Sequence, residues 1–202
     1  MTSIRIIGAG GHGKVVADVA AAVGYTDIAF LDRCFPERTL NGSWKICGTP
    51  SWDGPAHRFC AVGSNAVRAR LFDQSSLGDA PVLIHPFSSV SPSAYLQPGT
   101  LLVAGAIVNA DVNVGRGTIL NTGCSIDHDC IIGDFAHISP GARLAGNVQI
   151  GARTWIGIGA VVREGVKIGS DVTVAAGAAV IHDIADNMIV GGVPAVPLKR
   201  RN

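Results

Sequence analysis

The sequence predicts an α/β N-terminal domain followed by a parallel β-helix, and three observations carry this prediction. Glycine makes up 26 of the 202 residues, roughly twice its usual share, while 15% of the residues are charged and 5% are aromatic. A short apolar run meets a glycine-rich segment near the start of the chain. Branched aliphatic residues then recur at every sixth position through the second half. Because 48% of the residues are apolar, the chain can build a core, but its glycine content disfavours a helical bundle.

The first elements of the chain alternate between strand and helix. We expect, in order, a strand over 4–7, a helix over 14–23, strands over 28–32 and 59–65, and a helix over 66–72. Gly24 is expected to cap the first helix, since glycine readily adopts the backbone conformation that ends one. This alternation predicts a small parallel sheet, half of a Rossmann-like fold.

The glycine-rich segment after the first strand predicts an anion site. Gly8, Gly10 and Gly13 match the pattern GxGxxG, and Asp32 ends the second strand about twenty residues later. Backbone N–H groups at a helix N-terminus face an anion in such loops. Only one mononucleotide-sized half precedes the repeat, so a nucleotide diphosphate, as in a nucleotide sugar, fits better than NAD. A tight glycine turn without a ligand remains the alternative.

The second half of the chain is a strict six-residue repeat. Its branched aliphatic positions are Ile84, Val90, Leu96, Leu102, Val108, Val114, Leu120, Ile126, Ile132, Ile138, Leu144, Ile150, Ile156, Val162, Ile168, Val174 and Val180. A small or β-branched residue stands two positions before each of them. Side chains two apart on a strand share one face, so each unit is a short strand followed by a corner. This is the hexapeptide signature of a parallel β-helix.

A coarser period, of three such units, indicates triangular coils. Gly115, Gly133, Gly151 and Gly169 recur at every third unit and mark one corner per coil, where glycine supplies either an unusual φ or room for close stacking. The segment after Val180 leaves the period and is expected to cover the open sheet edge. We therefore expect a domain over 1–80, a β-helix over 81–183 and a C-terminal cap over 184–202.

Composition excludes several classes of function. A formal net charge of +1 gives no electrostatic case for nucleic acid or an anionic membrane, and no apolar run is long enough to span a bilayer. The chain start lacks the features of a signal peptide. The five cysteines show no paired spacing, which indicates reduced thiols in the cytoplasm and no zinc site. Cys124 and Cys130 fall on small inward positions and are expected to fill the core.

Two histidines break the repeat in a chemically suggestive way. His128 lies on the outward side of a corner between Asp127 and Asp129. A carboxylate beside an imidazole raises its basicity and fixes its tautomer, as a general base requires. His137 points outward from a strand half a coil later, so the two histidines are expected to share a site only across a subunit interface.

Four stretches of the chain together resemble one family. They are Gly8-Ala9-Gly10-Gly11-His12-Gly13-Lys14-Val15-Val16, Leu120-Asn121-Thr122, Asp127-His128-Asp129-Cys130-Ile131-Ile132-Gly133-Asp134-Phe135 and His137-Ile138-Ser139-Pro140-Gly141-Ala142. The chain resembles, nearly end to end, the bacterial sugar acyltransferases that include sialic-acid O-acetyltransferases and UDP-4-amino-sugar N-acetyltransferases of the bacillosamine type. The resemblance implies a left-handed β-helix homotrimer with acetyl-CoA bound between neighbouring helices.

The resemblance also implies roles for individual residues. His128 resembles the catalytic base and Asp129 the acidic residue that supports it. The positions that correspond to acetyl-CoA contacts are His137, Ile158 and Ala176, the last of which is Gly in a relative. The positions that correspond to nucleotide-sugar contacts are Gly11, His12, Gly13, Asp32, Arg33 and Gly63. Some relatives carry Asp-Asp where this chain has Asp32-Arg33.

The expected activity is therefore acetyl-CoA-dependent N-acetylation of the 4-amino group of a nucleotide-linked sugar, for surface glycan precursors. An O-acetyltransferase acting on sialic acid shares the scaffold and is the main alternative. A zinc enzyme of the carbonic-anhydrase type would need three suitably placed histidines, whereas a non-catalytic scaffold would not bind acetyl-CoA.

Overall fold

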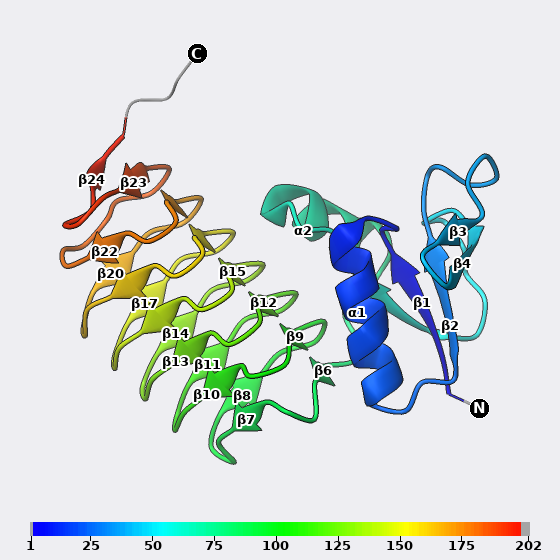
Figure 1. Cartoon of the computed structure of the whole chain (residues 1–202), viewed down its shortest axis with the longest axis horizontal. Coiled ribbons are helices and arrows are strands. Elements are labelled where there is room, and N and C mark those ends of the chain that lie inside the picture. The colour runs from blue at the N-terminus through cyan, green and yellow to red at the C-terminus, as the bar shows by residue number, and fades with distance from the viewer. Residues whose placement is uncertain (1, 199–202) are drawn as a thin grey trace.

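The computed structural model describes residues 2–198, in which an α/β sheet region lies beside a β-solenoid (Figure 1). The sheet region contains β1 (Ser3–Ile7), α1 (Gly11–Ala22), β2 (Asp27–Leu31), β3 (Leu40–Asn41), β4 (Trp44–Gly48), β5 (His57–Cys60) and α2 (Asn65–Gln74). Its strands lie in the order β3-β4-β2-β1-β5 and run parallel, except that β3 is antiparallel to β4. The predicted parallel sheet and both predicted helices are therefore present.

The sheet region differs from the expectation in several details, and α1 begins at Gly11 rather than at residue 14. The third strand ends at Cys60, and residues 61–64 lead into α2 with Ser64 at its N-cap. The short β3–β4 hairpin is a further difference, and its two-residue turn is Gly42-Ser43, with Gly42 at a φ of 62°. Gly24 follows α1 at a φ of 97°, as expected for a glycine that ends a helix.

The solenoid has three faces of two-residue strands. The first face contains β6 (Leu83–Ile84), β9 (Leu101–Leu102), β12 (Ile119–Leu120), β15 (His137–Ile138), β18 (Trp155–Ile156) and β21 (Thr173–Val174). The second contains β7 (Ser89–Val90), β10 (Ile107–Val108), β13 (Ser125–Ile126), β16 (Arg143–Leu144), β19 (Val161–Val162) and β22 (Ala179–Val180). The third contains β8 (Tyr95–Leu96), β11 (Asn113–Val114), β14 (Ile131–Ile132), β17 (Gln149–Ile150) and β20 (Lys167–Ile168).

Each strand pairs in parallel with the equivalent strand of the next coil, as in Ile119 with His137. We name each corner by the two faces it joins in chain order: first–second, second–third and third–first. At the third–first corner, a Cβ on Gly133 would lie 2.6 Å from the backbone nitrogen of Ala152. Its backbone does not need a positive φ, so close stacking, rather than an unusual conformation, explains the glycine that recurs once per coil.

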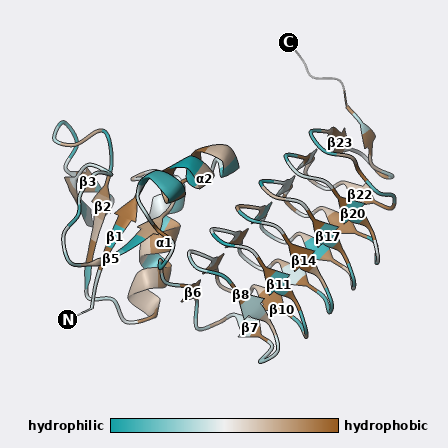
Figure 2. Cartoon of the chain, turned by 180° about the vertical axis from the view of Figure 1, so that it is seen from behind, coloured by the Kyte–Doolittle hydropathy of each residue, from teal (hydrophilic) through white to brown (hydrophobic). Residues whose placement is uncertain are grey.

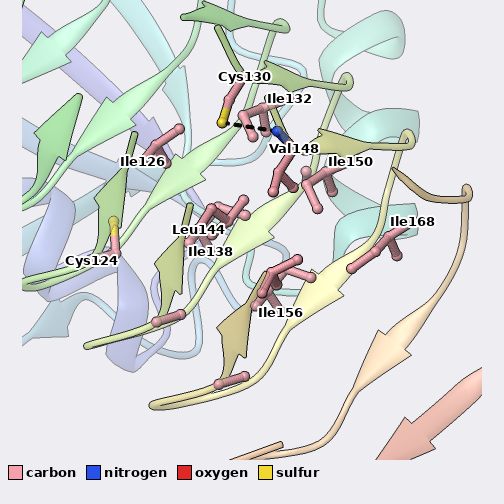
Figure 3. Packing of buried hydrophobic residues seen from close by; sticks show 14 of the residues in the cluster. Cys124, Ile126, Cys130, Ile132, Ile138, Leu144, Val148, Ile150, Ile156 and Ile168 are labelled. Carbon is pink, nitrogen blue, oxygen red and sulfur yellow. Dashed lines mark hydrogen bonds between the residues drawn. The ribbon is translucent and has the colours of Figure 1, made fainter. Parts of the chain in front are cut away.

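The predicted aliphatic positions line the inside of the solenoid (Figure 3). Cys124 and Cys130 are fully buried among them, and the backbone N–H of Val148 donates to the Cys130 Sγ at 3.3 Å. The first coil is an exception to the prediction, because Ile84 is 37% exposed. It lies on the end strand of its face, where no earlier coil covers it.

The sheet region packs on the outer side of the first face. Leu83, Leu101 and Ile119 occupy outward positions there, yet they are buried in one cluster with residues of the sheet and of α1. The sheet region therefore covers the early coils of this face, and His137 is the next outward residue along it. This placement determines the surroundings of the candidate site.

Beyond the repeat, β23 (Ile189–Gly191) pairs with β21, and β24 (Val196–Pro197) runs antiparallel to β23. Ile184, Met188 and Ala195 pack against the last part of the core. Residues 199–202 of the expected cap lie outside the described residues. Neither helix within 2–198 has the length and apolar character needed to cross a membrane.

Candidate active site

His128 lies at the second–third corner, between β13 and β14, with 60% of its side chain exposed. Its Nδ1 lies 2.8 Å from Oδ2 of Asp129. Asp127 holds the backbone instead, because its Oδ1 accepts from the His128 backbone N–H at 2.9 Å and from Nδ2 of Asn109 at 3.0 Å. The two aspartates predicted to flank the base therefore have different contacts.

The environment of His128 makes it a stronger base than a free histidine. The hydrogen bond to Asp129 raises its pKa, and the charge of Asp127 adds to this effect, while desolvation opposes it. A carboxylate accepts but cannot donate when ionised, so the proton sits on Nδ1 of His128 and Nε2 is free to accept another. This is the arrangement that general-base catalysis needs.

A glycine one coil further on makes room for this imidazole. A Cβ built on Gly146 would lie 2.6 Å from Cε1 and 2.7 Å from Nε2 of His128. Gly146 was not among the predicted site residues, although the coil period places it on the same corner as His128. The ring therefore lies against bare backbone.

His137 lies on the first face, and its surroundings differ from the expectation. Its side chain points outward from β15, but the residue is only 9% exposed because the sheet region covers it. The His12 ring, at the start of α1, lies 6.3 Å away between centroids. On its other side, the Trp155 ring stacks in parallel at 5.7 Å.

Asn121 fixes the tautomer of His137. The Oδ1 of Asn121 accepts from the backbone N–H and the hydroxyl of Thr122, so its amide nitrogen faces His137 Nε2 at 3.0 Å. Nε2 must then accept, and Nδ1 carries the proton of the neutral ring. The sequence placed Asn121 in a family-like stretch but gave no sign of this role.

Both histidines at this junction are neutral near pH 7. Burial lowers the pKa of His137 to about 3, and the charges of Arg68 and His12 act in the same direction. Burial and the charge of Arg68 lower the pKa of His12 to about 4. The Nε2 atom of His12 is buried and has no hydrogen-bond partner among the described residues. A neutral imidazole at this position can donate a hydrogen bond to a ligand, or accept one from it, without adding charge.

The other positions expected to contact acetyl-CoA follow His137 along the solenoid. Ile158 and Ala176 lie at the first–second corner, after β18 and β21, and both are exposed. They stack directly, since the Gly177 backbone N–H donates to the Ile158 carbonyl at 2.8 Å. We refer to His137, Ile158 and Ala176 as the cofactor row.

The residues expected to contact a nucleotide sugar lie at the carboxyl ends of the sheet strands. Gly11, His12 and Gly13 open α1, and a Cβ on Gly13 would collide with the carbonyl oxygen of Gly8. Beside this turn is a pocket of about 460 Å³, lined by Ile7, Gly8, Leu31, Asp32, Arg33, Pro50, Val67, Arg70, Leu71 and Gln74. Gly63 follows β5 and has open space beside its Cα.

Asp32 organises the loop at this pocket. Its carboxylate accepts from the backbone N–H of Ala9 at 2.7 Å and from that of Cys34 at 3.1 Å. Burial opposes ionisation, but these bonds and the charge of Arg33 outweigh it and lower the pKa of Asp32. An ionised Asp32 thus ties the first loop to the second.

Within one chain the candidate residues form two groups. The loop of Gly11, His12 and Gly13 meets the cofactor row at His137. His128 and Asp129 lie at a different corner of the solenoid. Among residues 2–198, no group of three or more His, Cys, Asp or Glu side chains is placed to hold a metal ion.

Two parts of the chain match known protein families. Residues 3–75 match the PglD N-terminal domain family, and residues 147–182 match the bacterial transferase hexapeptide (six repeats) family. The UDP-N-acetylbacillosamine N-acetyltransferase of Bacillus subtilis (strain 168) is 38% identical over 114 residues. That alignment covers 52% of this chain and 52% of that enzyme, so the chain spans about half the length of this curated relative.

Two solved structures match along nearly the whole chain. The acetyltransferase domain of PglB from Neisseria gonorrhoeae, in complex with acetyl coenzyme A, is 42% identical with a TM-score of 0.91, covering 97% of this chain and 98% of that chain. PerB from Caulobacter crescentus, in complex with CoA and GDP-perosamine, is 36% identical with a TM-score of 0.91, covering 98% of each chain.

A hexapeptide solenoid joined to an α/β domain of this kind defines an acyltransferase. The solved relatives, which match the chain along nearly its whole length, are sugar acetyltransferases. The chain belongs to the bacterial sugar acetyltransferases of the hexapeptide-repeat family.

Proposed function

We propose that this chain transfers an acetyl group from acetyl-CoA to the 4-amino group of a nucleotide-linked sugar. The observation that carries the proposal is the contact between the glycine-rich loop and the cofactor row, at the His12–His137 pair. A loop suited to a diphosphate and a surface suited to acetyl-CoA therefore meet at one point of the chain. The solved relatives hold acetyl-CoA, or CoA together with GDP-perosamine, which supports both ligands.

Acetyl-CoA is proposed to lie along the first–second corner, in contact with His137, Ile158 and Ala176. Ile158 is 61% exposed, which suits a residue that becomes covered by the pantetheine arm or by a neighbouring subunit. The neutral His137 has its proton on Nδ1, so it can donate to the thioester oxygen without carrying charge. Negative charge that develops on this oxygen is then stabilised in a dry environment.

The nucleotide sugar is proposed to bind at Gly11, His12, Gly13, Asp32, Arg33 and Gly63. The N–H groups that open α1 and the cation of Arg33 suit a diphosphate. Asp32 supports the site by holding the loop, because both of its oxygens already accept backbone N–H groups.

A homotrimer is proposed because one chain does not bring the base to the cofactor row. His128 lies exposed at the second–third corner, whereas His137 lies on the first face and Ile158 lies at the first–second corner. A second copy of the chain can supply its His128 to the row of the first, and closed three-fold symmetry would complete three identical sites.

The proposed reaction is a direct transfer with His128 as the general base. The amine nitrogen attacks the thioester carbon, the carbonyl π electrons move to oxygen, and Nε2 of His128 takes the proton that the nitrogen loses. The tetrahedral intermediate then collapses, the C–S bond breaks, and the proton from His128 goes to the sulfur of CoA. Asp129 keeps the ring oriented and stabilises its cationic form.

Reduced thiols and activated substrates support a location in the cytoplasm. All five cysteines are free, and three of them, Cys60, Cys124 and Cys130, are buried. Both acetyl-CoA and nucleotide sugars are substrates of biosynthesis in that compartment, which suits a supply of precursors for surface glycans.

The test is release of free CoA thiol from acetyl-CoA in the presence of UDP-, GDP- or dTDP-linked 4-amino sugars, with free sialic acid as a further acceptor. Thiol release with at least one nucleotide-linked amino sugar, and formation of the N-acetyl product by mass spectrometry, is the expected result. The same sugars without the 4-amino group are the matched control. Transfer to sialic acid alone would replace the proposal with O-acetylation, and no transfer to any acceptor would refute it.

A further inference from the structure

A fully buried arginine joins the two parts of the chain. Arg68 lies on α2, which carries both hydrophilic and hydrophobic residues (Figure 2), and Arg68 itself is only 1% exposed. Its guanidinium faces carbonyl and amide oxygens and forms no ion pair with a carboxylate of residues 2–198. Burial lowers the pKa of Arg68 to about 10, so the group stays charged near neutral pH.

On the solenoid side, Arg68 binds one corner on successive coils. Its Nε donates to the Gly117 carbonyl at 2.7 Å, and its Nη2 donates to the Phe135 carbonyl at 2.6 Å. The neighbouring Asn65 donates to the Arg153 carbonyl at 2.9 Å. Gly117, Phe135 and Arg153 occupy the same position in successive coils, so α2 is attached to the third–first corner of three coils in a row.

On the sheet side, the same guanidinium binds the loop that follows β5. Its Nη1 donates to the Val62 carbonyl at 2.9 Å and to the Gly63 carbonyl at 3.2 Å, and its Nη2 donates to Oδ1 of Asn65 at 2.9 Å. Gly63 is one of the proposed nucleotide-sugar contacts. A single planar group therefore spans from this loop to the solenoid that bears the cofactor row.

Lysine cannot reproduce these contacts. Arginine presents five N–H donors in a rigid planar fork, whereas lysine has three on one flexible nitrogen. Arg68 is also close enough to His12 and His137 for its charge to lower the pKa of both rings. Its fork and its charge therefore act on the loop and on the histidines that meet there.

We propose that Arg68 is a positioning residue, which holds the nucleotide-sugar loop at a fixed distance from the cofactor row so that the amine reaches the thioester. This inference rests on the proposed function. Because the backbone of the cofactor row belongs to the solenoid, loss of the fork should displace the sugar loop more than it displaces acetyl-CoA. A displacement of about 1 Å from productive geometry can cost on the order of a hundredfold in rate.

The experiment compares Arg68→Lys and Arg68→Met with the unaltered full chain. For Arg68→Lys we expect KM for the nucleotide sugar to rise and kcat to fall, together by roughly ten- to a hundredfold in kcat/KM, with the acetyl-CoA KM nearly unchanged. Arg116→Lys is the matched control. Arg116 also joins the solenoid to α2, through Asp73 at 3.3 Å, but it is partly exposed and does not touch the loop.

Hydrogen exchange at residues 61–64 and 8–13 gives a second measurement that needs no catalysis. We expect faster exchange at 61–64 in Arg68→Lys than in Arg116→Lys. Three results would overturn the proposal. They are a nucleotide-sugar KM in Arg68→Lys equal to that of the unaltered chain, an equal rise in KM for both substrates, or the same fall in kcat/KM in Arg116→Lys. If Arg68→Lys fails to fold while Arg116→Lys folds, Arg68 contributes to stability rather than to positioning, and the proposal fails. If the unaltered chain transfers to no amino sugar, the proposed function fails, and the exchange comparison still decides the role of Arg68.

Discussion

The contact between Gly146 and His128 gives a prediction whose size follows from the structure. In Gly146→Ala, the new Cβ would stand 2.6 Å from Cε1 and 2.7 Å from Nε2 of His128. Carbon atoms in contact are about 3.5–4.0 Å apart, so the ring must move by about 1 Å. The ring lies at the exposed end of a side chain and can move, but its 2.8 Å bond to Asp129 and the aim of Nε2 would be lost.

The expected result is a loss of activity without a loss of stability. A displacement of about 1 Å in the position of a catalytic group costs on the order of a hundredfold in rate, and removal of a general base altogether costs about 10²–10⁴-fold. We therefore expect kcat of Gly146→Ala to fall by roughly ten- to a hundredfold. The melting temperature and the acetyl-CoA affinity should stay close to those of the unaltered chain, because the displaced ring is on the surface. Initial-rate measurement of thiol release, together with a thermal melt, checks both expectations.

Two further variants show whether the effect acts through His128. Gly78→Ala is the matched control, since Gly78 has open space beside its Cα and no positive φ. In an His128→Ala background, Gly146→Ala should cause almost no additional loss, because effects on one catalytic unit are not additive. Full activity of Gly146→Ala, or an equal loss with and without His128, would refute the reasoning.

Three other predictions concern protonation. His128→Ala should lower kcat by about 10²–10⁴-fold while acetyl-CoA still binds, as measured by thiol release and by thermal shift. The rate should rise with pH through the raised pKa of His128, and a flat profile between about pH 6 and 9 would contradict the role of His128. Asp129→Asn should lose less activity than His128→Ala. It should also move the rise in rate to lower pH, because the hydrogen bond to Asp129 is the largest cause of the raised pKa. The folded chain keeps His12 and His137 unprotonated down to a pKa of about 4 and about 3, whereas the unfolded chain protonates them near their usual pKa of about 6.5. The unfolded state then binds more protons between these values, so stability should decrease as pH falls from about 6.5 toward 4, and His137→Gln should flatten this dependence in thermal melts.

The solenoid shows how far local pattern determines a fold. Each coil needs one aliphatic side chain per strand and a glycine where backbones stack most closely, and both requirements appear at fixed spacing in the sequence. Neighbours in space are one full coil apart in the chain, so the repeat also specifies register. The first coil departs from this pattern, because Ile84 has the right spacing but no earlier coil to bury it.

The burial of His137 could not be read from the repeat, because it depends on where the sheet region packs. One signal was present, since Leu83, Leu101 and Ile119 place aliphatic side chains at outward positions of the first face. Outward positions on an exposed face are expected to be polar, so this row marks the face that another element covers. The requirement for glycine at position 146 likewise becomes visible only when the His128 ring is placed beside it.

The sequence by itself determined the two-part architecture, the period of the solenoid, the position of His128 between its aspartates and the glycine turn that opens α1. Each of these follows from neighbours close in the chain or from a constant spacing. The tertiary structure decided that His12 lies against His137, that Asn121 holds the tautomer of that ring, and that Arg68 ties the Gly63 loop to three coils. These contacts join segments at no regular spacing, and they form only because the sheet region buries its apolar surface on one particular face of the solenoid.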